Sequence, residues 1–178
     1  MKKVFAFVLG TLMAAALFVS CENKQNPNQD SKPAVKGTYE LHLYVSEQAV
    51  DQQEVVKTVV TYPNNQGVSE EAEFSAFSED LLLVPLLPFD IPHKETVTIT
   101  QTLIPDVELT KDKYELGLSY SLTVKSVDDD DKVYDAKTLE KKDVHYSVRK
   151  ENMAGAFPLT ISLEISVDAS GKVSISEK

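Results

Sequence analysis

The chain has 178 residues, with 18 basic and 28 acidic side chains and a formal net charge of −10 at pH 7. Such an acidic surface repels phosphate backbones and anionic lipid head groups, which argues against nucleic-acid binding and against electrostatic attachment to a membrane surface. The length suits one domain with a hydrophobic core of its own.

Residues 1–20 have the three-part pattern of a secretory signal peptide. Lys2 and Lys3 precede an apolar run from Val4 to Val19 that has small residues near its end. The run is shorter than the roughly 20 residues that a transmembrane helix needs, and no other stretch of the sequence approaches that length. We therefore expect an export signal and no second membrane span.

Cys21 is the only cysteine of the chain and directly follows Ser20 at the end of this signal. The stretch Phe18-Val19-Ser20-Cys21 resembles the lipobox of bacterial lipoproteins, in the relaxed form of the Bacteroides group of Gram-negative bacteria. The resemblance implies a palmitate-type lipid on Cys21 and an anchor in the cell envelope, at the outer membrane, with the periplasmic or surface side left open. A lone thiol cannot form an internal disulfide in an oxidising compartment, and lipidation removes it.

Residues 21–36 are expected to be the lipidated cysteine and a flexible tether. The stretch has two prolines, no aromatic residue, and only Ala34 and Val35 as apolar content beyond the cysteine. Such a composition buries too little apolar surface to fold. Residues 37–178 follow without a second linker, and we expect them to form a single domain.

Alternation of apolar and polar residues with a period of two dominates this domain. The clearest run extends from Tyr114 to Val124, and similar runs occupy residues 39–45, 97–103, 144–148 and 159–167. This pattern is typical of strands with one buried face.

Three further segments complete the expected strands. A hairpin joins Val167 to Val173 through a loop that contains Gly171. Residues 54–62 are β-branched on both faces and suggest a strand covered on both sides or an early central strand, whereas residues 70–77 fit either a strand or a helical turn. Together the elements predict an all-β, antiparallel β-sandwich of the immunoglobulin-like, Greek-key type, with a small antiparallel barrel as the alternative.

The most conspicuous charge run consists of Asp128, Asp129, Asp130 and Asp131. Clustered carboxylates are ligands for Ca²⁺, so the run is a weak candidate for a calcium site. The spacing does not match an EF-hand loop, since Val133 and Leu139 stand where Gly and Glu are needed. The alternative is a solvated turn between two strands.

Residues 81–92 combine leucines with three prolines, which exclude a central strand because each proline removes a ladder donor. The segment fits an edge strand or a crossover that covers the core. Alternatively, an exposed apolar patch of Leu83, Leu86, Leu87 and Phe89 docks an envelope protein partner.

No motif in the sequence predicts catalysis or a cofactor. The spacing of His42, His93 and His145 matches no metal-binding motif, and His93 follows Pro92 in an expected loop. We therefore expect no enzyme but a lipid-anchored cell-envelope module that binds a partner or serves as a structural accessory. The first alternative is a fimbria-like fibre subunit that polymerises by strand addition. The second is an unrecognised hydrolase, which would bring two or more carboxylates, or a histidine and a carboxylate, together in a pocket.

Overall fold

The structure is a computed structural model that describes residues 33–64, 67–74, 80–83 and 88–178. The signal peptide, Cys21, Leu86 and Leu87 lie outside the described residues. The regular structure begins with β1 (Lys36–Tyr44), and Ala34 just ahead of it is buried.

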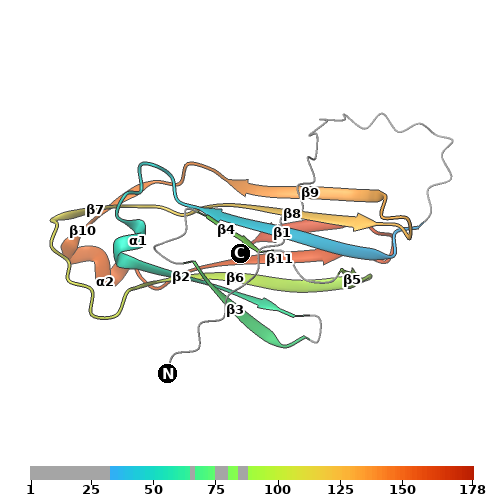
Figure 1. Cartoon of the computed structure of the whole chain (residues 1–178), viewed down its shortest axis with the longest axis horizontal. Helices are drawn as coiled ribbons and strands as arrows, with labels where there is room; N and C mark the ends of the chain where they lie inside the picture. Colours follow the sequence, from blue (N-terminus) through green and yellow to red (C-terminus); the bar gives the residue numbers. More distant parts are fainter. Residues whose placement is uncertain (1–32, 65–66, 75–79, 84–87) are drawn as a thin grey trace, which may run out of the picture. The chain divides into compact units, whose positions relative to one another are not determined.

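The first sheet is built around β1 (Figure 1). Its neighbour on one side is β8 (Ser119–Val127), which pairs in turn with β9 (Val133–Lys141). On the other side β1 pairs with β4 (Asp80–Leu83) and β5 (Phe89–Asp90). The proline-rich segment therefore supplies two short edge strands, as one of its two interpretations predicts.

The second sheet has the strand order β12-β11-β6-β2-β3 and is antiparallel throughout. Its strands are β12 (Val173–Glu177), β11 (Leu159–Val167), β6 (His93–Leu103), β2 (Val56–Pro63) and β3 (Ser69–Phe74). The predicted hairpin at Gly171 is confirmed as the β11–β12 connection. The ambiguous segment is a strand as far as Phe74. Of the β-branched run, residues 56–62 belong to β2, which lies between β6 and β3, whereas residues 54 and 55 belong to a short helix, α1 (Gln52–Val55).

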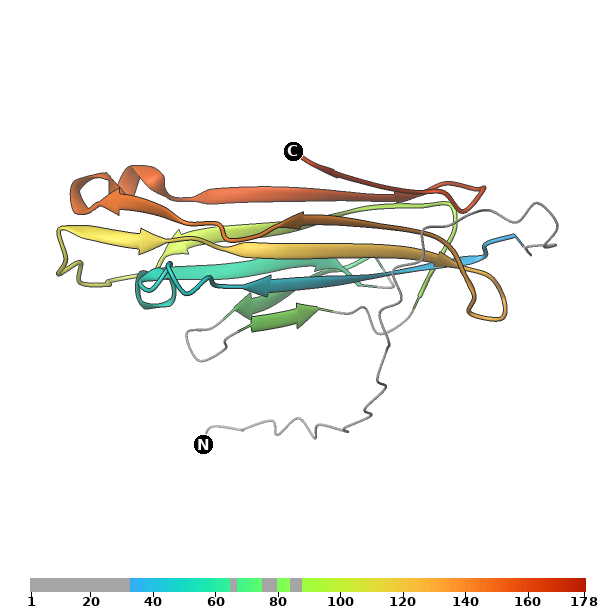
Figure 2. The ribbon, with the colours of Figure 1, turned by 90° about the horizontal axis from the view of Figure 1, so that it is seen from above.

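The two sheets enclose one core between their inward faces (Figure 2). The fully buried side chains of this core include Tyr39, Leu41, Leu43, Val97, Ile99, Tyr120, Leu122, Val124, Leu163 and Ile165. They alternate along β1, β6, β8 and β11, so the pattern that predicted strands also predicted the core. The predicted all-β sandwich is confirmed, and no sheet that the described residues form closes into a barrel. The finer immunoglobulin-like class stays a prediction.

A smaller apolar cluster lies at the end of the sheets where β1 ends and β2 begins (Figure 1). It is formed mainly by residues of α1 (Gln52–Val55), the start of β2, β7 (Lys113–Leu116), β10 (Tyr146–Arg149) and α2 (Met153–Ala156). The short 3-10 helix η1 (Lys150–Asn152) joins β10 to α2. β7 and β10 pair with each other and belong to neither large sheet. No helix in this part of the chain or elsewhere in the described ranges has the length and apolar character to span a membrane.

The predicted single strand from Tyr114 to Val124 is wrong, because the chain divides it into β7 and β8 at Gly117 and Leu118. Gly117, Leu118 and Ser119 are all buried, so the alternation breaks at this point. The N–H of Gly117 donates to the side-chain oxygen of Gln52, 3.1 Å away, instead of to a strand.

One flank of the sandwich is closed by side chains that connect β9 and β12, which belong to different sheets. The N–H of Val173 donates to Oδ2 of Asp135 at 2.8 Å. Nearby, the Lys141 ammonium lies 2.6 Å from the carboxylate of Glu177. These contacts fix the two sheets against each other along this flank.

Candidate functional site

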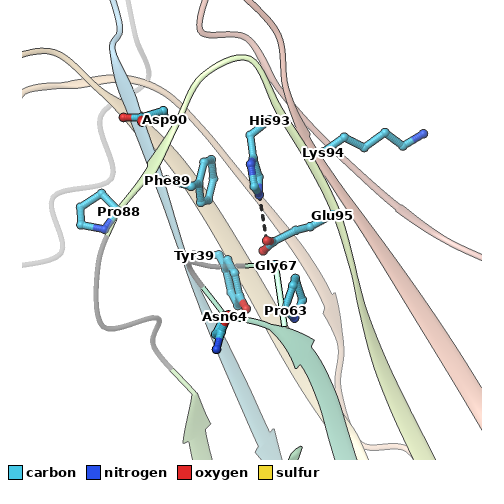
Figure 3. Close-up of a pocket in the computed structure, with 10 residues that line it drawn as sticks. All are labelled: Tyr39, Pro63, Asn64, Gly67, Pro88, Phe89, Asp90, His93, Lys94 and Glu95. Atoms are coloured by element: carbon cyan, nitrogen blue, oxygen red, sulfur yellow. Dashed lines mark hydrogen bonds and ion pairs between the residues drawn. The ribbon is translucent and has the colours of Figure 1, made fainter. Parts of the chain in front are cut away.

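A pocket of about 460 Å³ opens at the end of the sandwich where β6 begins (Figure 3). Its walls come from β1, β5, the start of β6, and the connection between β2 and β3. The residues that line it are Tyr39, Pro63, Asn64, Gly67, Pro88, Phe89, Asp90, His93, Lys94 and Glu95. The volume lies within the range of small-ligand sites.

The aromatic wall of the pocket depends on a glycine in β1. Phe89 of β5 pairs with Gly37, and a Cβ at Gly37 would lie 2.1 Å from the Phe89 ring. The ring therefore occupies the space above the glycine. On its other side the ring stacks on His93, with the centroids 4.1 Å apart and the planes at 18°. The position of His93 is thereby fixed by packing.

A histidine–carboxylate pair lies within the pocket (Figure 3). Nε2 of His93 is 2.8 Å from Oε2 of Glu95. Both residues stand on β6 in phase with Val97 and Ile99, which face the core. Only 9% of the Glu95 side chain is exposed, and its other oxygen, Oε1, is buried without a hydrogen-bond partner among the described residues.

Tyr39 contributes a second buried polar atom. Its side chain is 1% exposed, and its hydroxyl has no hydrogen-bond partner in the described part of the chain. Burial raises the pKa of Tyr39 well above its usual value, and the negative charge of Glu95 raises this pKa further. The phenol is therefore a neutral donor at physiological pH. An unpartnered buried polar group costs about 1–3 kcal/mol, so two of them in one pocket indicate a place where a ligand could bind.

Lys94 lines the rim of the pocket but does not neutralise Glu95. Its ammonium contacts the carboxylate of Glu164 on β11, and Figure 3 shows the side chain pointing away from the other labelled residues. Glu164 also pairs with Lys178 at 2.5 Å. These two lysines, Lys178 first, hold the pKa of Glu164 at about 2, so the ion pairs outside the pocket persist in mild acid.

The residues predicted for partner binding are divided by the structure. Leu83 is buried in the main core, where it supports the core-covering interpretation of this segment. Phe89 is partly buried and forms a wall of the pocket instead of an exposed patch. Leu86 and Leu87 lie outside the described residues, as does the predicted lipidation site Cys21.

The aspartate run forms the turn between β8 and β9. Oδ1 of Asp128 accepts hydrogen bonds from the N–H groups of Asp130 and Lys132 at 3.0 and 2.9 Å. Asp131 has a φ of 59°, as the tight turn requires. Among the described residues no group of three His, Cys, Asp or Glu side chains is arranged to hold a metal ion. The geometry thus favours the solvated-turn interpretation over the calcium site.

The three histidines occupy separate surroundings. His42 packs against Tyr44 with the ring centroids 5.3 Å apart, and His145 lies 2.8 Å from Glu115. His93 is the first residue of β6 and not a loop residue, so its predicted setting was wrong.

Sequence reasoning did not identify Tyr39 and Glu95 as site residues. The signal that could have found Glu95 is its phase, because it stands two residues before Val97 on the inward face of the strand. A carboxylate at such a position needs a partner. Comparison of the chain with family models, with curated proteins and with solved structures finds no match.

Proposed function

We propose that this protein is a lipid-anchored module of the bacterial cell envelope that acts by binding, with the pocket beside β5 and β6 as its binding site. The proposed location in the cell envelope rests on the signal pattern of residues 1–20 and on the lipobox-like stretch that ends at Cys21. Multiple acyl chains on one cysteine give stable anchoring, which a single chain does not.

The observation that supports binding is the pair of buried polar atoms in the pocket. The hydroxyl of Tyr39 and Oε1 of Glu95 are withdrawn from water and have no partner among the described residues. A ligand that supplies those partners recovers the free energy that their burial costs. The site is largely preformed, because Phe89, Gly37 and His93 fix one another by packing.

The proposed lipid anchor is tested by metabolic labelling of cells with a clickable palmitate analogue. The wild-type protein is expected to carry the label and to remain with the membrane fraction, whereas Cys21→Ala loses both properties. Ser20→Ala is the matched control, since it keeps a small residue before the cysteine and leaves the thiol in place. An unlabelled wild type, or equal release of the wild type and Cys21→Ala into the medium, contradicts the anchor. Proteolysis of intact cells then separates the surface from the periplasmic side.

A hydrolase is the second candidate, and one observation favours it. His93 and Glu95 lie together in a pocket, as general-base catalysis requires, and the carboxylate could orient the imidazole. The lining, as far as the described residues form it, includes no serine, threonine or cysteine, so the pair would have to activate water. Loss of ester or amide hydrolysis in His93→Asn, with retained activity in His42→Asn, would establish this candidate. Absence of turnover in the wild type on such substrates argues for binding.

The fibre-subunit alternative stays a prediction of the sequence. Its test is the state of the protein extracted from the envelope. A ladder of non-covalent oligomers that resist heating in gel electrophoresis supports strand addition. A single band at the size of one chain contradicts it.

A further inference from the structure

We infer that the pocket binds the protonated amine of a small ligand with an apolar body. The inference rests on the proposed function in taking this pocket as a binding site, and it adds the chemical class of the ligand. Three features of the described lining carry it: the carboxylate oxygen without a partner, the lack of a lysine turned towards that oxygen, and the apolar walls.

The carboxylate of Glu95 offers one oxygen for a ligand. Oε2 is already engaged by His93 at 2.8 Å, whereas Oε1 is buried and unpartnered among the described residues. A carboxylate accepts its strongest hydrogen bonds from charged donors, and an ammonium group is the smallest charged donor that a ligand can present. Glu95 therefore selects a cation over a neutral hydroxyl.

The charged groups around Glu95 favour a cationic ligand over an anionic one. Asp90 also lines the pocket and adds negative charge at its rim, with its side chain pointing away from Glu95 (Figure 3). Lys94 is the one lysine among the described residues of the lining, and it is paired with Glu164 on the outer side. An anionic ligand would therefore meet the carboxylate of Glu95 with no lysine of the described lining turned towards it. A cationic ligand meets the carboxylate of Glu95 in a partly enclosed site, where electrostatic attraction is stronger than in bulk water.

The aromatic residues suit the apolar body of such a ligand. Tyr39 and Phe89 line the pocket with Pro63 and Pro88 beside them (Figure 3). The accessible edge of the Phe89 ring and the two prolines provide an apolar surface for the remainder of the ligand. The hydroxyl of Tyr39 is available to a second polar group on the same molecule. A volume of about 460 Å³ admits one such molecule.

The test uses the full chain, purified in non-ionic detergent, and three matched probes: benzylamine, benzyl alcohol and phenylacetate. Binding is followed by nuclear magnetic resonance at the amides of Gly37, Phe89 and Glu95 during titration to millimolar concentration. We expect benzylamine to bind at least about tenfold more tightly than benzyl alcohol, because it adds a charge-assisted bond, and we expect no shift with phenylacetate. Glu95→Gln should abolish this preference, since it keeps the shape of the side chain and removes its charge.

Control variants separate the pocket from the rest of the core. Tyr39→Phe should weaken benzylamine only a few-fold, because it keeps the ring and removes only the hydroxyl, and Tyr120→Phe, in the same core but outside the lining, should leave binding unchanged. Equal binding of the amine and the alcohol, with no effect of Glu95→Gln, overturns the amine but leaves a binding pocket and the proposed function. No shift with any probe overturns both the ligand class and the binding role of the pocket. The anchor at Cys21 is judged separately, by the palmitate label.

Discussion

Gly117 and Val144 approach so closely that no side chain fits between them: a Cβ at Gly117 would lie 1.9 Å from the carbonyl oxygen of Val144. The approach marks the point where the chain leaves the small β7–β10 sheet and enters the large sheet as β8. The glycine is thus needed for space and not for a special backbone angle.

Gly117→Ala is therefore expected to lower the free energy of unfolding by about 1–3 kcal/mol or more, because the obstructing atom belongs to the backbone and has to move. Urea denaturation of the full chain measures the change. Gly155→Ala is the matched control, since no atom of the described residues lies within 4 Å of a Cβ at that position and the residue is in α2. The control should be neutral or slightly stabilising. Similar losses in both variants would contradict the crowding at Gly117.

Tyr39 and Tyr120 provide a matched pair for the energetics of the core. Both are fully buried, but the hydroxyl of Tyr120 donates to Oε2 of Glu177 at 2.5 Å, whereas that of Tyr39 has no partner among the described residues. Tyr120→Phe should cost about 1.5–3 kcal/mol, as for a hydrogen bond to a charged group. Tyr39→Phe should be neutral or stabilising in ligand-free protein. Thermal and urea denaturation measure both, and a comparable loss in Tyr39→Phe would show that its hydroxyl is satisfied.

Glu115 makes the folded state sensitive to acid. Hydrogen bonds from Lys113 first, then Ser147 and His145, lower the pKa of Glu115 from 4.5 to about 2. A lowered folded-state pKa means that the unfolded chain binds the proton more readily, so the stabilisation is complete above pH 4.5 and is lost as the pH falls towards 2.

The acid sensitivity is measured as the midpoint of urea denaturation at a series of pH values from 6 to 2. This range includes the ordinary pKa of Glu115, 4.5, and its folded-state pKa of about 2. Glu115→Gln should flatten the decline below pH 4.5 and lower the midpoint at neutral pH. The exposed Glu108→Gln serves as the control and should leave the curve unchanged in shape. If the urea midpoint of Glu115→Gln falls below pH 4.5 as steeply as that of the wild type, Glu115 is not the source of the acid sensitivity.

Asp51 links α1 to β7. Its Oδ2 accepts from the N–H of Glu115 at 2.8 Å, and its Oδ1 contacts the ammonium of Lys111. The Asp51 side chain is 4% exposed, whereas Glu54, which also contacts Lys111, is 66% exposed. Asp51→Ala should cost about 1–3 kcal/mol, because it leaves a backbone donor unpaired. Glu54→Ala should cost less than about 1 kcal/mol. Equal costs in urea denaturation would contradict the buried role of Asp51.

The strands were predictable where one face of the chain is apolar over many residues, as in β1, β6 and β11. The division between β7 and β8 was not, because the apolar residues Leu116 and Leu118 keep the period of two across it. The available signal was Gly117 itself, since a glycine inside a strand pattern often marks a close backbone approach. The small β7–β10 sheet forms by pairing of distant segments, which local periodicity does not reveal.

The pocket could not be predicted from the sequence, for a related reason. Phe89 was selected for its apolar character, but its place beside His93 depends on β5 pairing with β1 above Gly37, which lies far away in the sequence. Glu95 and Tyr39 appear among inward-facing residues, so an inspection of polar atoms on those faces would have identified both. The anchor at Cys21 rests on the sequence pattern alone.

The pairing of β1 with β8 also determines how the domain responds to mechanical load. The register extends from Lys36–Val127 to Tyr44–Ser119 without interruption, and the chain enters β1 at Lys36. A pull on the preceding residues along the strand axis stretches all of these hydrogen bonds together instead of opening them one after another. A β-strand loaded in this shear geometry resists extraction, so the anchor proposed at Cys21 would load β1 in the direction in which its pairing with β8 is hardest to break.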